Sequence, residues 1–181
     1  MRTHPLIIIA TLAFALVACG TVREDPLEGT VGKMRILSEH FVTNGPIPAD
    51  VTCDGKDRSP AFTFSKVPED TKSLVLVSYD PDSPSGLWVH WLIYNIDPTV
   101  SEVKEGTVPD SGLQGVTGWG DTSYRGPCPP SGVHRYYFQL YALDTTLPLF
   151  DAPPDWATVK KALKGHILER AEIFGRYERK K

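Results

Sequence analysis

Residues 73–84 read SLVLVSYDPDSP, and the fold is best interpreted outward from this stretch. Its first seven residues are mostly apolar and rich in β-branched side chains, which predicts a buried β-strand. Two carboxylates and two prolines follow at once, so polar groups are expected on a rigid loop at the end of that strand. Residues 88–96 and 135–143 predict two further strands. We therefore expect a β-rich domain with its polar groups gathered at strand ends.

The composition agrees with one β-rich domain. The chain has 181 residues, of which 41% are hydrophobic and 23% charged, so it can form a packed core and is not a disordered protein. Its 16 prolines and 15 glycines suit a domain with many loops better than a helical bundle. The formal net charge of -3 excludes the strongly basic character of proteins that coat nucleic acids. No internal repeat is visible, which disfavours solenoids and propellers.

The N-terminus predicts an export signal. An early cation, a short apolar run and then Cys19 predict a signal peptide over residues 1–18. Residues 16–19 read LVAC, which is similar to the lipobox of bacterial lipoproteins, where the cysteine is acylated and the chain is cut before it. We expect residues 19–33 to form a lipidated tether and residues 34–181 to form the domain. The alternative is a plain signal peptide that contains a cysteine.

A lipidated Cys19 would anchor the protein to a bacterial envelope membrane, and Gly20 after it favours the outer membrane where one exists. Two cysteines, Cys53 and Cys128, then remain in the exported domain. An even number permits one disulfide, but sequence separation does not give distance in space. One bridge and two separate buried thiols therefore both remain open.

The C-terminal segment changes its periodicity and predicts an amphipathic helix. Asp155 before it suits an N-cap, and Gly175 suits a stop. The apolar residues that recur at steps of three or four are Trp156, Val159, Leu163, Ile167, Ala171 and Phe174.

Two motifs contain most of the residues that could carry chemistry. The first combines residues 80–84 with Trp88-Val89-His90-Trp91, and the second is YRGPCPPSGVHRY over residues 124–136. Each places acidic or histidine side chains at the end of a predicted strand, where rigid loops can build a small polar pocket. We expect Trp91 to lie in the core on the face opposite His90, unless the strand bulges there.

These motifs, in this order, resemble the phosphatidylethanolamine-binding protein family, in its bacterial Raf-kinase-inhibitor-like branch. The resemblance also includes TCDG at residues 52–55, SP at 59–60, GHIL at 165–168 and GRY at 175–177, so it covers nearly the whole predicted domain. One departure lies at residues 115–120, where similar proteins carry an asparagine near Thr117.

The resemblance implies a mostly β fold, with a large central, mainly antiparallel sheet packed on a smaller sheet, short helices and a C-terminal α-helix. It also implies a small pocket for anions such as phosphate, acetate or a phosphoethanolamine headgroup, without a metal or cofactor. The matching pocket residues are Asp80, Asp82, Pro84, Trp88, His90, Pro129, His134 and Tyr136, with the backbone from Gly126 to Cys128 beside them.

Two carboxylates in an anion pocket need a chemical explanation. If each holds a histidine, it favours the imidazolium form, which can donate to a phosphate oxygen. Alternatively, a carboxylate could meet the ammonium group of ethanolamine. Tyr136 could donate its hydroxyl, and Pro84 and Trp88 would form apolar walls.

Three functions fit these residues. The first is a membrane-tethered binding protein for a small anionic or phosphoryl ligand, such as a phospholipid headgroup. The second is an inhibitor or partner of an envelope protease or another protein, because an exported chain would not meet a cytosolic kinase. The third is a metal-dependent hydrolase that uses two aspartates and two histidines as ligands. No nucleophile–base–orienter set is visible, so we expect a binding or regulatory protein rather than an enzyme, and no nucleic-acid partner.

Overall fold

Strand β4 (Ser73–Asp80) is buried along its whole length because it lies in the middle of a six-stranded sheet. The computed structural model describes residues 31–180. All strand pairs of this larger sheet are antiparallel except that of β2 with β9. Its strands, in spatial order, are β2 (Gly45–Pro46), β9 (Ile167–Tyr177), β8 (His134–Leu143), β4, β5 (Trp88–Ile96) and β7 (Leu113–Gln114).

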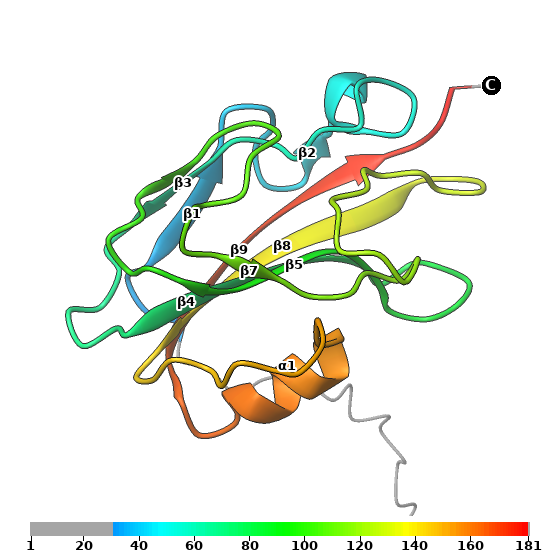
Figure 1. The fold of residues 1–181 in the computed structure, drawn as a ribbon. Coiled ribbons are helices and arrows are strands. Elements are labelled where there is room, and N and C mark those ends of the chain that lie inside the picture. Colours follow the sequence, from blue (N-terminus) through cyan, green and yellow to red (C-terminus); the bar gives the residue numbers. More distant parts are fainter. Residues whose placement is uncertain (1–30, 181) are drawn as a thin grey trace, which may run out of the picture.

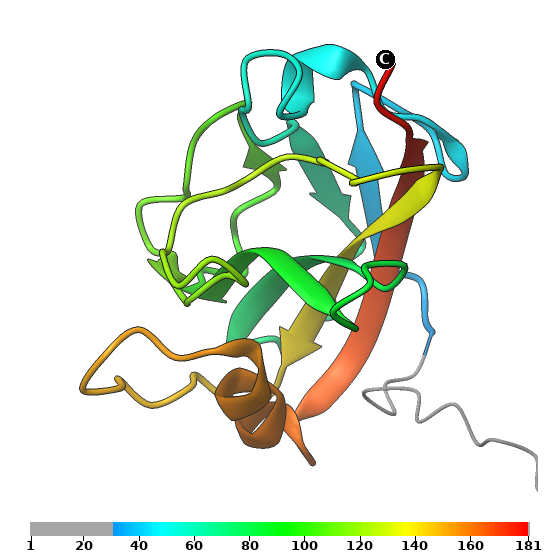
Figure 2. The same cartoon turned by 90° about the vertical axis from the view of Figure 1, so that its right-hand side faces the viewer.

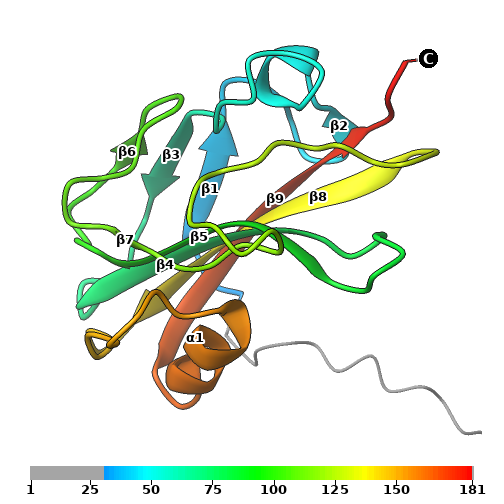
Figure 3. The ribbon, with the colours of Figure 1, turned by 45° about the vertical axis from the view of Figure 1, so that its right-hand side comes forward.

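A smaller antiparallel sheet covers one face of the larger sheet (Figures 1 and 3). Its strands are β1 (Arg35–Ser38), β3 (Phe62–Ser65) and β6 (Glu102–Val103), with β3 in the middle. Along β3 the two phenylalanines are buried and the two hydroxyl residues are exposed, as expected for a strand with one face on the core. A short 3-10 helix, η1 (Ala49–Val51), precedes this strand.

The larger sheet has a core on each of its two faces. Between the sheets, Leu74 and Leu76 of β4 join a cluster that includes Phe62 and Phe138, whose ring centroids are 4.9 Å apart. On the other face, Val75 and Val77 pack in one cluster with helix α1 (Trp156–Leu163), which Figure 2 shows on the side of the larger sheet opposite the smaller sheet. Both faces of β4 are covered, which explains why its sequence is apolar without alternation.

The predicted strands at residues 73–79, 88–96 and 135–143 are confirmed. The mostly β fold of two packed sheets is confirmed as well. Asp155 is the N-cap of α1, and its carboxylate accepts a hydrogen bond of 2.8 Å from the Thr158 N–H.

The predicted length of the C-terminal helix is wrong. Helix α1 ends at Leu163, and Gly165 follows with a φ of 81°, a left-handed conformation that turns the chain back. The rest of the segment is strand β9, which pairs antiparallel with β8 along its whole length. Ala171 and Ile173 point inward with the alternation of a strand, and the helical spacing of the apolar residues was coincidental beyond α1.

Gly175 is correspondingly not a helix stop. It lies in β9, where a Cβ atom would come within 2.4 Å of the Ile47 side chain. His166 lies in the turn between α1 and β9, where its Nδ1 is 2.8 Å from the carboxylate of Asp144. The predicted signal peptide, Cys19 and most of the tether lie outside the described residues. Within residues 31–180, no helix has the length and apolar character needed to cross a bilayer.

The strand arrangement brings three strand ends together. Because β4 runs antiparallel to both β5 and β8, the end of β4 at Asp80 adjoins the beginnings of the other two. Figure 1 shows the loop between β4 and β5 and the segment that leads into β8 at the same end of the sheet. The two motifs singled out in the sequence therefore meet in space.

Candidate ligand-binding site

A pocket of about 280 Å³ opens where these three strand ends meet. The loop after β4 forms one side, the beginning of β5 and Tyr136 of β8 form the floor, and the loop before β8 forms another side. The residues that line it are Asp80, Ser83, Pro84, Ser85, Trp88, His90, Trp119, Cys128, Pro130 and Tyr136.

A β-bulge directs His90 into this pocket. Ser78 pairs with Trp91 and Tyr79 pairs with Val89, so His90 is an extra residue on β5 with no partner on β4. Val89 packs in the core beneath α1, whereas Trp91 packs in the core between the sheets. In a regular strand these two residues would share a face. Trp91 is in the core as expected, and the bulge is what allows its neighbour to face the pocket.

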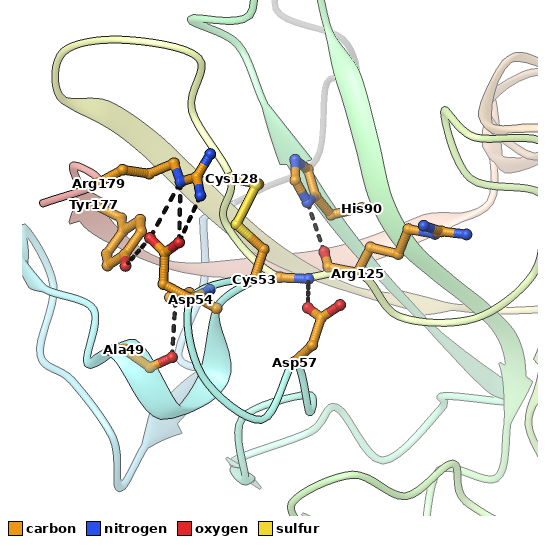
Figure 4. Close-up of a disulfide and its surroundings, with 11 residues drawn as sticks. Ala49, Cys53, Asp54, Asp57, His90, Arg125, Cys128, Tyr177 and Arg179 are labelled. Atoms are coloured by element: carbon orange, nitrogen blue, oxygen red, sulfur yellow. Dashed lines mark hydrogen bonds and ion pairs between the residues drawn. A yellow bond between two sulfur atoms is a disulfide. The ribbon is translucent and has the colours of Figure 1, made fainter. Parts of the chain in front are cut away.

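The imidazole of His90 is held by a backbone carbonyl. Its Nδ1 lies 2.6 Å from the carbonyl oxygen of Arg125, and because a carbonyl only accepts, Nδ1 carries the proton. Burial lowers the pKa of His90 below its ordinary value, and the Arg125 carbonyl offsets this only in part. With the pKa lowered, the ring is neutral at pH 7 and its proton is on Nδ1, so Nε2, which points away from Arg125 in Figure 4, is an unprotonated acceptor.

Aromatic rings fix the position of His90. The rings of Trp119 and Tyr136 meet it edge-on, with centroids 5.0 Å and 5.2 Å away. Trp88 contacts Trp119 in the same way at 5.4 Å. The polar pocket thus has rigid apolar walls, which suits a site that binds one small polar group.

The hydroxyl of Tyr136 is the only buried side-chain nitrogen or oxygen within residues 31–180 that makes no well-aligned hydrogen bond, although the Asp80 carboxylate and the Cys128 backbone lie close to it. The side chain is 1% exposed and lines the pocket. Burial, with the nearby charge of Asp80, raises the pKa of Tyr136, so its hydroxyl keeps the proton. An unsatisfied buried donor costs about 1–3 kcal/mol, and a ligand oxygen in the pocket could recover this.

Asp80 and His134 form a buried pair beside the pocket. Asp80 Oδ2 lies 2.7 Å from His134 Nδ1, and both residues are less than 9% exposed. The second carboxylate oxygen of Asp80 accepts a bond of 2.8 Å from the Asp82 N–H. This carboxylate therefore holds a histidine, as expected from the sequence.

The expectation that Asp82 also holds a histidine is wrong. Its carboxylate accepts two bonds from the Arg135 guanidinium, at 2.6 and 2.8 Å, and a third from the Arg135 backbone N–H at 2.9 Å. Arg135 holds the pKa of Asp82 below its ordinary value. The adjacent His134 already has Asp80, so the second carboxylate pairs with the cation next along β8. Asp82 consequently shapes the loop and does not line the pocket.

A disulfide joins Cys53 and Cys128, with the two Cα atoms 5.5 Å apart. Of the two alternatives left open by the sequence, the structure therefore contains the bridge. Cys128 lines the pocket, and Cys53 lies on the segment between η1 and β3 (Figure 4). The bridge thus ties one wall of the pocket to a part of the chain far from it in sequence.

The pocket contains most, but not all, of the residues expected from the family resemblance. Six of them line it: Asp80, Pro84, Trp88, His90, Cys128 and Tyr136. His134 pairs with Asp80, Asp82 pairs with Arg135, and Gly126 and Pro129 are buried in the loop before β8 without lining the pocket.

Four lining residues were missed by the sequence analysis. Ser83 lies inside the first motif, and Ser85 directly follows its residues 80–84. Pro130 is one position from the predicted Pro129. Trp119 belongs to the glycine-rich segment noted as a departure from the family, and a single aromatic residue between two glycines was the signal available there.

The metal-dependent hydrolase has no matching ligand set in the described chain. Across residues 31–180, no group of three or more His, Cys, Asp or Glu side chains is arranged to hold a metal ion. His90 and His134 are held by different partners, and Asp82 is engaged by Arg135.

Comparisons with known proteins agree with this architecture. Residues 37–178 match the family described as phosphatidylethanolamine-binding protein. A UPF0098 protein from Methanothermobacter thermautotrophicus is 44% identical over 151 residues, which cover 81% of this chain and 99% of that protein. A UPF0098 protein from Chlamydia trachomatis is 41% identical over 151 residues, with the same coverage.

Solved structures show the same fold. The crystal structure of a putative phosphatidylethanolamine-binding protein homologue from Chlamydia trachomatis has a TM-score of 0.78 at 41% identity, and covers 81% of this chain and 98% of its own. Escherichia coli YbcL has a TM-score of 0.77 at 31% identity, and covers 82% and 100%. The family match spans both sheets and every strand end around the pocket, and the chain belongs to the phosphatidylethanolamine-binding protein family.

Proposed function

We propose that this protein is a binding protein of the bacterial envelope, tethered through a lipidated Cys19, which holds a small anionic or phosphoryl group in the pocket at the strand ends. The observation that carries the proposal is the Tyr136 hydroxyl, which lines the pocket as a buried donor and makes no well-aligned hydrogen bond within residues 31–180. Such a donor costs stability in the free protein, so its retention is explained by a ligand that accepts the hydrogen bond.

The two polar groups on the floor of the pocket complement a singly protonated phosphoryl group. Tyr136 supplies a donor, and the unprotonated Nε2 of His90 supplies an acceptor. A phosphate monoanion has oxygens to accept from the tyrosine and one P–OH to donate to the imidazole. The buried carboxylate of Asp80 nearby disfavours a second negative charge on the ligand, which again favours the monoanion.

The mouth of the pocket favours a ligand with an apolar part. Trp119 lines the pocket and is 40% exposed, and Leu87 and Val133, which immediately precede Trp88 and His134, are 44% and 55% exposed. Exposed apolar groups around a polar pocket are typical of sites that bind amphiphiles or contact membranes. We therefore favour a phospholipid headgroup over free phosphate.

Calorimetric titration of residues 20–181 with O-phosphoethanolamine and with inorganic phosphate tests the proposal. The chain without its leader is suitable because relatives that consist almost entirely of this domain exist as whole proteins. Saturable binding that is lost in Tyr136→Phe and His90→Ala is the expected result. Leu113→Ala, an exposed residue of β7 outside the pocket lining, serves as the control and should bind as the parent does.

A sedimentation assay with phosphatidylethanolamine vesicles separates a membrane headgroup from free phosphate. Pelleting with vesicles that is reduced in Leu87→Ser and Val133→Ser, while phosphate binding is kept, supports the headgroup. Flat calorimetric traces from the folded protein would contradict the binding proposal.

A further inference from the structure

Two segments distant in sequence are fastened to each other beside the pocket. We call residues 53–57 the anchor segment and residues 125–128 the carbonyl loop. The Cys53–Cys128 disulfide connects their far ends, and the Cys53 N–H donates to the Pro127 carbonyl at 3.2 Å. The Asp57 carboxylate accepts a hydrogen bond of 2.6 Å from the Gly126 N–H, as Figure 4 shows around Asp57.

Asp57 satisfies a backbone group that water does not reach. Gly126 is buried, so its N–H requires a protein acceptor, and Asp57 supplies it although the residue itself is exposed. Packing is tight here, since a Cβ atom on Gly126 would lie 2.4 Å from the Val51 carbonyl oxygen. The carbonyl loop therefore depends on the anchor segment for both its hydrogen bonding and its position.

The carbonyl loop in turn holds the imidazole of His90. The Arg125 carbonyl accepts from His90 Nδ1 at 2.6 Å, and the Arg125 N–H donates to the His90 carbonyl at 3.1 Å. The Arg125 carbonyl and the Gly126 N–H belong to the same peptide group, so Asp57 and His90 bind opposite ends of one rigid, planar unit. Displacement of this peptide would remove the acceptor that keeps the proton on Nδ1.

We infer that Asp57 is a positioning residue of the pocket, and that it acts with the Cys53–Cys128 disulfide to keep the Arg125 carbonyl against His90 without touching the ligand. The anchor segment thereby sets how well the pocket binds an anionic ligand. Opening the disulfide weakens binding in the same way. The effect on affinity rests on the proposed function, whereas the effect on the His90 ring does not.

The first test compares variants of Asp57 by two measurements. Asp57 has a φ of 54°, so Asp57→Gly removes the carboxylate without backbone strain, and Asp57→Asn keeps an acceptor oxygen. Long-range proton–nitrogen NMR spectra of the His90 ring report its tautomer in the free protein. Calorimetry with O-phosphoethanolamine reports affinity.

We expect Asp57→Gly to lose the single Nδ1–H tautomer and to bind roughly five- to tenfold more weakly. Asp57→Asn should keep the tautomer and bind within about twofold of the parent, because the hydrogen bond to Gly126 survives. Lys66→Gly is the matched control, since Lys66 also has a positive φ (56°) and is exposed, but lies after β3 in the small sheet.

The second test opens the disulfide. A dithiol such as dithiothreitol supplies two electrons and two protons, which convert the Cys53–Cys128 bond into two thiols while the reagent closes to a cyclic disulfide. Reduced protein should show the same His90 spectrum and the same loss of affinity as the Cys53→Ser, Cys128→Ser double variant. That double variant should not respond further to the reagent.

A folded Asp57→Gly protein with the parental His90 spectrum would overturn the inference, whatever its affinity. If the parent binds neither O-phosphoethanolamine nor phosphate, the proposed function fails. A changed His90 spectrum in Asp57→Gly would in that case still support the positioning role.

Discussion

Strand β5 has a β-bulge near each end, and the two bulges differ in how the side chain of the bulged residue is hydrogen-bonded. At the far end, Leu74 pairs with Ile96 and Leu76 with Ile93, which leaves an extra residue on β5. Asn95 has a φ of 56° there, and its amide donates to the Leu147 carbonyl at 2.9 Å and accepts from the Leu147 N–H at 2.8 Å. At the pocket end the bulged residue is His90, which lines the pocket and has one ring nitrogen bonded to Arg125 and the other pointing away from it (Figure 4).

The difference separates a structural bulge from a functional one. Both polar atoms of the Asn95 side chain bond to the backbone of Leu147, in the segment before α1. Next to His90, the Tyr136 hydroxyl makes no well-aligned hydrogen bond within the described chain. Polar groups that are left incomplete in a rigid setting are expected where a ligand completes them, because they only cost stability otherwise.

The largest expected effect comes from Asn95→Ala. The variant loses two hydrogen bonds to Leu147 and forces alanine into a left-handed conformation, so we expect a loss of about 3 kcal/mol in the free energy of unfolding. Chemical denaturation measures the loss. Affinity for O-phosphoethanolamine should stay within about twofold of the parent, and a larger drop would show that the two ends of β5 are not independent.

Tyr136→Phe should do the opposite. The variant removes an unsatisfied hydroxyl, so stability should be unchanged or should rise by up to about 1 kcal/mol. Affinity for O-phosphoethanolamine should fall by about tenfold, because the ligand loses one buried hydrogen bond. Denaturation and calorimetry on the same preparation decide the matter, and a clear destabilisation would mean that the hydroxyl has a structural role.

The Asp82–Arg135 pair offers a test by pH. Because Arg135 lowers the pKa of Asp82 in the folded protein, the pair stabilises fully above the ordinary carboxyl pKa of about 4 and its contribution fades as pH falls through the lowered value. With both side chains partly exposed, we expect Asp82→Asn to cost about 1 kcal/mol near neutral pH. Denaturation of both proteins from about pH 7 down to pH 3 should show the difference shrinking only at the acidic end; a difference that does not depend on pH would exclude this electrostatic origin.

The smallest expected effect is the pH dependence of anion binding through His90. Burial lowers the pKa of His90 in the free protein, and an anion beside Nε2 raises it, so binding takes up a proton and strengthens as pH falls. Between about pH 8 and pH 6, the affinity for acetate, whose charge is constant there, should rise by roughly threefold. His90→Gln should remove this dependence, and an affinity that weakens on acidification would contradict the assignment of Nε2.

Much of the fold was predictable because its main signals are local. The apolar stretch over residues 73–79 and the alternation in residues 135–143 follow from which faces of the strands are covered. The C-terminal helix was predicted too long because apolar residues at steps of three or four continue past α1 by chance. The long pairing with β8 is what makes Ile167–Tyr177 a strand. Pairing with a segment distant in sequence cannot be read from the local spacing of apolar residues.

The candidate site was predictable as a set of residue types but not as a set of contacts. Aspartates at the end of β4 and a histidine at the beginning of β8 had to meet once the strands were antiparallel. Their pairing could not be foreseen, since Asp80 reaches His134 and Asp82 reaches Arg135 through the register of β4 on β8. Trp119 and Pro130 line the pocket because of the conformations of their loops, which no periodic sequence pattern predicts.

The sequence by itself determined the strands, the turns, the family and the residue types at the strand ends, because these depend on local patterns of polarity and on rigid proline and glycine positions. Tertiary structure alone decided which way His90 faces, that Cys53 reaches Cys128, and that the Tyr136 hydroxyl makes no well-aligned hydrogen bond within residues 31–180. Each of these depends on one residue of register or on segments brought together across the fold. Contacts of that kind are properties of the packed chain, and no stretch of the sequence contains them.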